Sequence, residues 1–223
     1  MTVATFPASR GRAVVEALIG TIDANAMLLS EIDGAIGDGD HGVNMRKGFT
    51  QARERFTPTT DLVGGLEILG DTLLTEIGGS MGPLYGTFFE EMARVAAGRS
   101  EVGADLFGSM LDAGIDAVLD LGGARVGDKT LVDVMVPARD AYHASLTADG
   151  TFADALDSMA RAADQGRDST RDLVARVGRA SRLGERSRGV VDAGATSCAL
   201  LLNAFASSIR ELLSETDVET RPS

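Results

Sequence analysis

Apolar residues recur at every third or fourth position along most of this chain, and no segment shows the strict alternation of a half-buried strand. Such spacing places apolar side chains on one face of a helix, so it predicts a series of amphipathic helices. Trp is absent and aromatic residues make up only 4% of the chain, so the core is expected to be aliphatic. The pattern argues against a β-sandwich and indicates an all-α protein.

Eight helices are expected, and no linker between them is long enough to divide the chain. They cover about 11–30, 43–56, 61–77, 83–98, 102–121, 129–145, 152–177 and 194–214. Pro137 should kink or break the sixth helix, because proline removes a helical hydrogen bond. We therefore expect one domain over 1–223 with an ordered core of about 10–214, and with frayed ends at 1–8 and 215–223.

Composition limits the ligands that such a protein can bind and the cellular compartment in which it works. The formal net charge of −12 argues against binding a nucleic-acid backbone or an anionic membrane. The single cysteine, Cys198, excludes an intrachain disulfide, and its place in an apolar stripe predicts a buried, inert thiol. No apolar run is expected to approach the roughly 20 residues of a membrane span, and the start of the chain does not resemble a signal peptide. A soluble cytoplasmic protein is expected.

The connections between the expected helices are of two kinds. Those after the second, fourth and sixth helices are short and plain, and read TPTT, GRSE and LTADG. Those after the first, third, fifth and seventh are rich in glycine, and read IDGAIGDGDHG, GGSMGP, GGARVGDK and GRASRLGERSRGVVDAG. Short loops favour antiparallel neighbours, so helices that alternate in direction would bring all four special loops to one end. This arrangement predicts one composite site.

The first special loop carries three carboxylates, Asp33, Asp38 and Asp40, separated mainly by glycine. Carboxylate oxygens suit hard cations. An EF-hand starting at Asp38 fails, because Val43 and Phe49 stand where that motif needs Gly and Glu. The spacing instead resembles sites that hold Mg²⁺ against phosphate, although a plain Gly-Asp turn is the alternative.

Two histidines complete the titratable residues of interest. His41 directly follows the carboxylates, and is either a phosphate or metal contact or an ordinary loop histidine. His143 lies near the end of the sixth helix with no partner in view, so a surface position is expected.

The other three special loops have features that favour anions. GGSMG precedes a helix that starts near a proline, and exposed N–H groups at such a start attract anions, although a tight glycine turn is the plain alternative. GGARVGDKT is close to a P-loop, but Asp128 interrupts the motif and a helix precedes it, so we reject that assignment. The fourth loop ends in VDAGAT, which offers Asp192 as an N-cap for the last helix.

The fourth loop is also strongly basic in an acidic protein. Five arginines face one glutamate within 176–188: Arg176, Arg179, Arg182, Arg186 and Arg188. A solvated loop is the plain interpretation, but arginine also matches phosphate geometry well. Carboxylates, glycine turns and arginines at one end are together what a Mg²⁺–nucleotide phosphate site requires.

Four motifs in order, IGDGDHGVNM, GGSMGPLYGTFF, GDKTLVDVMVPA and GRASRLGERSRGVVDAGATS, resemble the nucleotide-binding L subunit of dihydroxyacetone kinases. The same domain forms the C-terminal half of single-chain dihydroxyacetone kinases. The resemblance covers about residues 10–214. It implies a closed barrel of eight antiparallel amphipathic helices that holds ADP or ATP with two Mg²⁺ ions at one end.

The resemblance also implies a role for individual residues. It makes Asp33, Asp38 and Asp40 the Mg²⁺ ligands. It places in the nucleotide pocket His41, Gly42, Val43, Asn44, Ser80, Met81, Gly122, Leu131, Arg179, Asp192, Ala193 and Gly194. It gives this chain no catalytic residue beyond the metal and nucleotide site.

Partners follow from the same resemblance. In this family a separate K subunit holds the ketose through a covalent hemiaminal to a histidine, so this chain is expected to be one half of a kinase. The phosphoryl donor is either bound ADP recharged by a phosphotransferase-system M subunit or free ATP, and the sequence leaves both open. It also leaves open another short sugar such as erythrulose, and a regulatory module that binds nucleotide without catalysis.

Two positions depart from the family pattern. Met81 stands where a small hydroxyl residue is usual, so one contact to a phosphate oxygen is lost because a thioether cannot donate a hydrogen bond. Ala193 replaces a usual proline, which costs rigidity more than chemistry.

Overall fold

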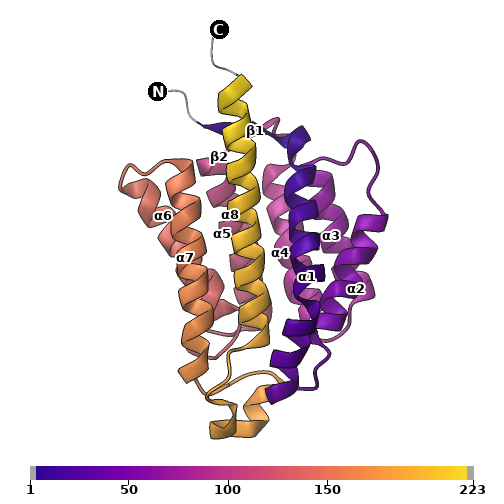
Figure 1. The fold of residues 1–223 in the computed structure, drawn as a ribbon, viewed down its shortest axis with the longest axis vertical. Coiled ribbons are helices and arrows are strands. Elements are labelled where there is room, and N and C mark those ends of the chain that lie inside the picture. The colour runs from indigo at the N-terminus through magenta and orange to yellow at the C-terminus, as the bar shows by residue number, and fades with distance from the viewer. Residues whose placement is uncertain (1–3, 220–223) are drawn as a thin grey trace.

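The computed structural model describes residues 4–219, with side chains up to residue 216. Eight α-helices, α1 to α8, account for most of this part of the chain (Figure 1). Their bounds are α1 Arg12–Ile36, α2 His41–Glu54, α3 Leu62–Glu76, α4 Met81–Ala96, α5 Ala104–Gly122, α6 Val132–Thr147, α7 Phe152–Ser169 and α8 Ala193–Glu219. Three 3₁₀-helices are η1 Ala8–Arg10, η2 Thr170–Asp172 and η3 Arg179–Ser187, and two strands are β1 Thr5–Pro7 and β2 Glu101–Gly103.

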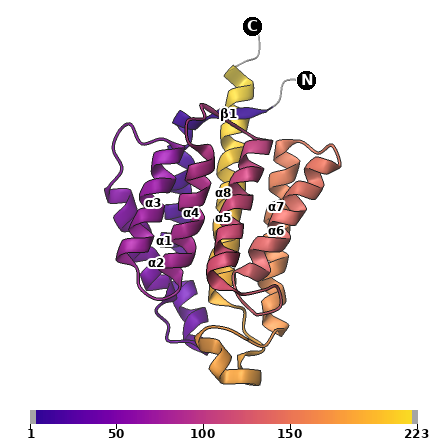
Figure 2. The same cartoon turned by 180° about the vertical axis from the view of Figure 1, so that it is seen from behind.

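The α-helices form a closed ring. Each packs against the next one in the sequence, and α8 packs back against α1. They run up and down along the long axis, as the two opposite views in Figures 1 and 2 show. One hydrophobic core takes side chains from every α-helix of the ring. The expected all-α, closed arrangement of eight antiparallel helices is confirmed.

Aromatic side chains contribute more to this core than their number suggests. Tyr85, Phe88 and Phe89 of α4 are buried, and the Phe89 ring lies 6.0 Å from that of Phe49 on α2. A second cluster joins α5 to the helices that follow it, through Phe107, Tyr142, Phe152 and Phe205. The core is therefore mostly aliphatic, with two aromatic clusters where helices meet.

The closed ring gathers the four glycine-rich connections at its lower end in Figure 1, while both described ends of the chain lie at the upper end. Several helix bounds differ from expectation. α1 continues to Ile36 instead of ending near residue 30, because Ile36 is itself buried and extends the apolar face. α6 begins at Val132, three residues later than the expected start at Lys129.

Pro137 does not break α6, which runs without interruption from Val132 to Thr147. Proline has no N–H, so the carbonyl of Asp133 four residues earlier loses its helical donor. That carbonyl lies against Gly166 of α7, where a Cβ would come within 2.4 Å of the oxygen. The backbone of α7 at Gly166 thus packs against the carbonyl oxygen that lost its helical donor.

The seventh helix is shorter than expected, since α7 ends at Ser169 and η2 follows it.

The chain ends are more regular than expected. β1 pairs antiparallel with β2, with Phe6 opposite Val102, and the Phe6 side chain is completely buried. The expectation that 1–8 is frayed is therefore wrong for the part that the structure describes, and so is the expectation of no strand. α8 likewise continues past residue 214 to Glu219. The remaining expectations of fraying, for 1–3 and 220–223, lie outside the described residues.

Within the described part of the chain, one helical segment is long and apolar enough to cross a membrane by length and composition. It is Ala8–Ile36, whose most apolar window has a mean hydropathy of 1.4. The expectation that no apolar run approaches this length is wrong here. Core helices of globular folds share this property, and α1 buries eight residues where it packs along α2, α3 and α8. Its place in the ring accounts for its composition.

The contact between α1 and α2 can be tested at Gly42. A Cβ on Gly42 would lie 1.9 Å from the Ala26 carbonyl oxygen and 2.8 Å from the Ser30 nitrogen, both backbone atoms of α1. Gly42→Ala should therefore lower the free energy of unfolding by about 2–4 kcal/mol, measured by urea unfolding. Gly20→Ala, in an open part of α1, is the control and should be neutral or stabilising by up to about 1 kcal/mol. Equal stability of the two variants would contradict this packing.

Candidate functional site

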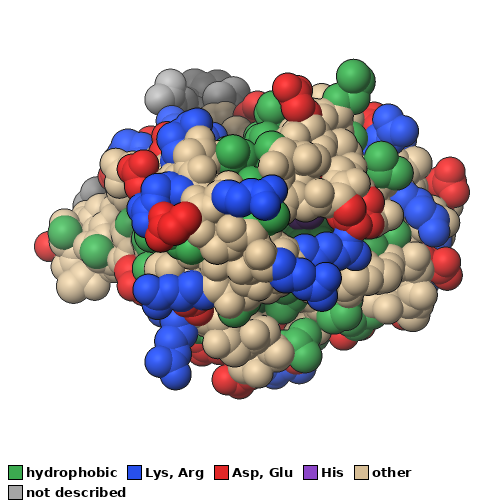
Figure 3. All heavy atoms as spheres, turned by 90° about the horizontal axis from the view of Figure 1, so that it is seen from below, with side chains coloured by type: hydrophobic (Ala, Val, Ile, Leu, Met, Phe, Trp, Pro, Cys, Tyr) green, Lys and Arg blue, Asp and Glu red, His purple; other side chains and the backbone are tan. Residues whose placement is uncertain are grey.

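A pocket of about 660 Å³ lies at the end of the ring where the glycine-rich connections meet. Its walls come from four separate parts of the chain, within 33–44, 78–84, 118–132 and 177–194. Figure 3 looks onto this end and shows basic and acidic side chains mixed around a central hollow. The sequence prediction that the four special connections share one end, and form one composite site there, is confirmed in its geometry.

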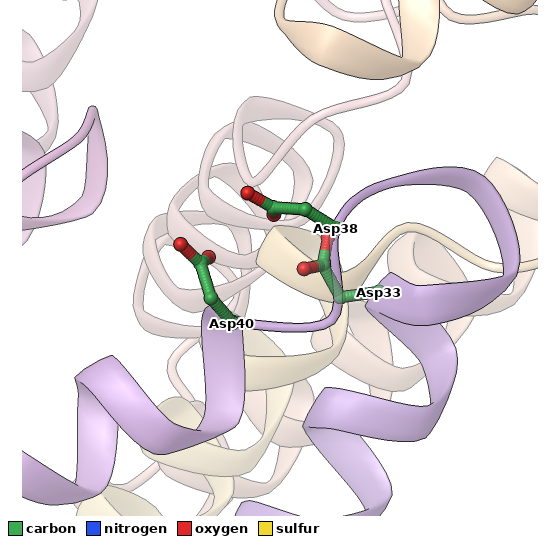
Figure 4. A group of neighbouring side chains, drawn as sticks. All are labelled: Asp33, Asp38 and Asp40. Atoms are coloured by element: carbon green, nitrogen blue, oxygen red, sulfur yellow. The ribbon is translucent and has the colours of Figure 1, made fainter.

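Three carboxylates form one wall of the pocket. Asp33 lies in the last turn of α1, Asp38 lies in the short connection, and Asp40 is the N-cap of α2. Each offers an oxygen within 4.8 Å of the oxygens of the other two. Figure 4 shows the three side chains directed around one small space. Like charges at this separation repel one another, so the group attracts a cation.

The backbone explains why these carboxylates converge. α1 ends with a hydrogen bond in which the Gly37 N–H donates to the Asp33 carbonyl oxygen at 2.5 Å. Gly39 then takes a left-handed φ of 77°, which glycine adopts without strain. The connection is therefore shorter than expected and Asp33 is held by the helix, so only Asp38 belongs to the loop proper.

A cation from the far part of the chain already meets this group. Arg179, the first residue of η3, forms ion pairs with Asp38 and with Asp40, the second at 3.7 Å. A guanidinium among these carboxylates shows that the space accepts positive charge. All the donor atoms are carboxylate oxygens, and this donor set suits a hard divalent cation such as Mg²⁺.

Three helices begin at the pocket. α2 starts at His41, α4 at Met81 and α8 at Ala193, and all three residues line the pocket. Asp40 and Ser80 are residue types that commonly cap helices, yet neither side chain accepts a capping hydrogen bond from its helix. The first N–H groups of α2 and α4 have no intrahelical partner and carry the positive end of the helix dipole. The first of them, the His41 N–H, donates to the Asp33 carboxylate of α1 at 3.4 Å. Such ends bind anions.

His41 is buried, and its Nε2 lies 3.0 Å from the Ser197 hydroxyl on α8. Burial lowers the pKa of His41 to about 4, against a smaller opposing effect of Asp33, so the ring is neutral near pH 7. The ring therefore contacts another helix instead of serving as a simple loop histidine. His143 is partly exposed, as expected for a surface position, but it has a partner, because its Nε2 lies 2.9 Å from an Asp112 carboxylate oxygen.

Lys129 holds the fourth segment in place. Its side chain is buried, and its Nζ donates to the carbonyl oxygens of Thr170 at 2.6 Å, Val190 at 2.5 Å and Leu173 at 3.3 Å. Burial lowers the pKa of this ammonium below its usual value. The lysine of the GGARVGDKT turn binds backbone carbonyls on both sides of η3, which agrees with rejecting the P-loop assignment. Lys129 thus fixes the segment that carries Arg179.

The start of α8 is capped as expected. The Asp192 carboxylate accepts a hydrogen bond from the Ala195 N–H at 2.8 Å, and the Asp192 N–H donates to the Thr170 hydroxyl. Cys198 is buried one turn further along, and burial raises the pKa of its thiol, which fits the expected inert cysteine.

The structure brings most of the anticipated residues to the pocket. Ten of the expected nucleotide-pocket residues line it: His41, Asn44, Ser80, Met81, Gly122, Leu131, Arg179, Asp192, Ala193 and Gly194. The two that do not are Gly42, whose Cα faces the α1 backbone, and Val43, whose side chain is exposed. A second wall, which the sequence did not indicate, is apolar and contains Ile36, Pro83, Leu84, Val118, Leu121 and Val177.

The arginine cluster disperses in the structure. Arg179 lines the pocket, whereas Arg176 lies 3.8 Å from Asp128 and Arg188 pairs with Glu185 at a separate depression. Arg182 and Arg186 are exposed. The expectation of a joint arginine site therefore holds for one residue, because Arg176 and Arg188 lie near acidic side chains outside the pocket and the other two arginines are exposed to solvent.

Comparisons with known proteins agree on one family. A model of the DAK2 domain matches residues 35–207. The ADP-binding subunit DhaL of PEP-dependent dihydroxyacetone kinase 1 from Listeria innocua is 39% identical, over 82% of this chain and 88% of that protein. The corresponding Escherichia coli subunit is 38% identical over the same shares. The L-erythrulose 1-kinase of Mycolicibacterium smegmatis is 36% identical, over 86% of this chain but 34% of that protein.

Solved structures agree on the fold. The dihydroxyacetone kinase of C. freundii matches with a TM-score of 0.67 at 24% identity, over 93% of this chain and 36% of that chain. Its complex with AMP-PNP and Mg²⁺ matches with a TM-score of 0.65 at 22% identity, over 91% and 34%. At these identities the match establishes the all-α fold.

The ionisation of Asp192 gives a first test. Burial raises the pKa of its carboxyl to about 6, against partial compensation by the Ala195 N–H and Lys129. Between pH 4 and pH 6 the folded state thus keeps a proton that the unfolded chain has released, so this contribution to stability falls as pH rises. Asp192→Asn keeps an N-cap without titrating. Its stability relative to wild type should rise by up to about 2 kcal/mol between pH 4 and 7, in urea unfolding without nucleotide. A constant or falling difference would contradict the burial of this carboxyl.

Lys129 gives a second test. Lys129→Met should leave the carbonyls of Thr170, Leu173 and Val190 without their shared donor and lower the free energy of unfolding by about 2–4 kcal/mol. The chain's other lysine, Lys47, is exposed on α2, and Lys47→Met should change stability by less than about 0.5 kcal/mol. Chemical denaturation of both variants measures the difference. A loss at Lys129 no larger than that at Lys47 would exclude the clamp.

Proposed function

The chain belongs to the DAK2-domain family, and from this premise we propose that it is the nucleotide-binding subunit of a dihydroxyacetone-type kinase. In this role it binds ADP or ATP with Mg²⁺ at the pocket and presents the terminal phosphoryl group to a ketose held by a separate K subunit. The chain is thus a phosphotransferase component that acts on an alcohol group. Its unpaired, buried cysteine and its PEP-dependent relatives support a cytoplasmic location.

The observation that carries this proposal is the pairing of opposite charges across one pocket. Three carboxylates form one wall, and the uncapped N-termini of α2 and α4 open onto the same space. Carboxylates alone would repel a polyphosphate, and helix N-termini alone would not require a metal. A metal–phosphate complex satisfies both at once, because the cation meets the oxygens and the phosphates meet the N–H groups.

Each part then has a task. Asp33, Asp38 and Asp40 would hold two Mg²⁺ ions, which when bound neutralise charge on the phosphates during transfer. The first turns of α2 and α4, with Asn44 and Ser80, would donate hydrogen bonds to phosphate oxygens.

The remaining walls suit the rest of the nucleotide. The Arg179 guanidinium lies close enough to the carboxylates to contact a phosphate held beside them. Leu84 and Val118 of the apolar wall, together with Leu131 and the nearby Gly122, provide apolar contacts for the faces of a purine base. The turn Asp192–Gly194 closes the pocket at the start of α8.

The acceptor must be held elsewhere. If the ketose is bound through a histidine, as in the family that the motifs resemble, neither histidine of this sequence is suited to it. His41 is buried against Ser197, and His143 contacts Asp112. A K subunit therefore supplies the ketose site, and the pocket end of the ring must face it during transfer.

We favour bound ADP that is recharged by an M subunit of a phosphotransferase system over free ATP. The support comes from relatives of nearly the same length that are named PEP-dependent or PTS-dependent kinase subunits. This donor predicts that ADP co-purifies with the chain and resists dialysis. Free exchange of ADP with added ATP would favour the second donor instead.

An erythrulose-type acceptor is the second candidate, because erythrulose kinases are also similar to this chain. Met81 supports a substrate other than dihydroxyacetone. It is the first residue of α4 and lines the pocket at a position where a hydroxyl residue is usual in the family. To identify the acceptor, phosphoryl transfer is measured with dihydroxyacetone and with erythrulose, each supplied with its K-type partner. Tight ADP binding without transfer to either ketose would instead identify a regulatory module.

The metal assignment is tested at Asp38. Asp38→Asn removes one charge from the carboxylate group and should weaken Mg²⁺-dependent ADP binding by at least about 100-fold in isothermal titration calorimetry, with helicity unchanged. Asp23→Asn, at an exposed position of the same helix α1, should bind like wild type. Unchanged ADP affinity in Asp38→Asn would refute the carboxylates as metal ligands.

A further inference from the structure

A buried polar cluster connects the three helices that begin at the pocket. His41 is the first residue of α2, Tyr85 lies one turn into α4, and Ser197 lies one turn into α8. The Ser197 hydroxyl is at the centre, 3.0 Å from His41 Nε2 and 2.8 Å from the Tyr85 hydroxyl. Each helix thus contributes one member, within its first five residues.

The cluster closes on the backbone of α8. The Gly194 carbonyl oxygen lies 3.0 Å from the Ser197 hydroxyl and 3.3 Å from the Tyr85 hydroxyl. One arrangement satisfies every group: His41 and Tyr85 donate to the Ser197 oxygen, and Ser197 donates to Gly194. Gly194 also lines the pocket, so the cluster lies directly behind the pocket wall.

The surroundings make this arrangement hard to replace. Tyr85 and Ser197 are fully buried, the Phe89 ring stacks beside Tyr85, and Cys198 follows Ser197 in the core. A polar group left without a partner in such surroundings is costly, so the three helices are held in the one relative position that satisfies all of them. Apolar contacts alone would tolerate small shifts of one helix along another.

We propose that Tyr85 and Ser197 are positioning residues for nucleotide binding, which hold the first turns of α2, α4 and α8 so that their N–H groups converge on the phosphates. The inference rests on the proposed function, because it requires an anion at these helix starts. Neither residue touches the nucleotide in this account. Each acts through the helix that it anchors.

The chain offers a matched control at the other end of the ring. Tyr142 of α6 is also fully buried, and its hydroxyl donates to the Ala104 carbonyl at 2.8 Å. Ala104 starts α5, away from the pocket. Tyr142→Phe and Tyr85→Phe therefore remove the same atom from equally buried sites, one remote from the proposed site and one behind it.

The experiment compares the two variants by calorimetry, with Mg²⁺·ADP as the ligand, well below their melting temperatures. Both should melt about 2–4 °C below wild type, since each loses one buried hydrogen bond. Tyr85→Phe should also bind Mg²⁺·ADP about fivefold or more weakly, whereas Tyr142→Phe should bind as wild type does. Wild-type affinity in Tyr85→Phe, with a lowered melting temperature, would overturn the inference and leave the proposed function intact.

A double-mutant cycle tests whether the cluster acts as a unit. Ser197→Ala should weaken Mg²⁺·ADP binding as Tyr85→Phe does, and the double variant should lose little more than either single variant. Fully additive losses would contradict a shared network. A wild-type chain that does not bind Mg²⁺·ADP at all would overturn this inference and the proposed function together.

Discussion

The structure depends on the closure of a ring of antiparallel helices. Because each helix reverses the direction of the one before it, every second connection falls at the same end, and α8 returns beside α1. Four segments that are far apart in the sequence therefore meet at one end of the ring. The connections at the opposite end are free to be short and plain, and the paired strands β1 and β2 lie there.

The charges around the pocket determine which ligand this end of the ring can bind. A chain with a net charge of −12 places three carboxylates beside two uncapped helix starts and one arginine. Arg179 brings a positive charge to these carboxylates through its ion pairs with Asp38 and Asp40. The buried contacts behind the pocket, from Lys129 on one side and from His41 on the other, fix the segments that bring these charges together.

Helical periodicity was enough to predict eight helices, because most apolar stripes were long and unambiguous, whereas their closure into a ring was implied by the family resemblance. The special connections could be recognised from composition, and the alternating direction of the helices predicts that they meet at one end. Boundaries were less predictable. The sequence DGAI looks like a turn because of Gly34, yet Ile36 gains burial by continuing α1, and this packing outweighs the local preference.

Side-chain direction was the least predictable feature. A run of arginines suggests one basic site, but only Arg179 of that run lines the pocket. Lys129 looks like a phosphate ligand by its motif, and only the fold shows that its ammonium meets three backbone carbonyls. Tyr85 and Ser197 lie within two of the family motifs, but nothing in those motifs indicates that the two hydroxyls meet, so the cluster that they form with His41 could be found only from the structure.

The central claim is that the carboxylates and the helix starts bind one metal–nucleotide complex between them. The most direct measurement is a crystal structure grown with ADP and Mn²⁺, in which anomalous scattering locates the metal. The account predicts metal density among the oxygens of Asp33, Asp38 and Asp40, with the ADP phosphates between that metal and the first turns of α2 and α4. Metal density away from these carboxylates, or ADP bound at the separate depression near Arg176 and Arg188, would contradict it.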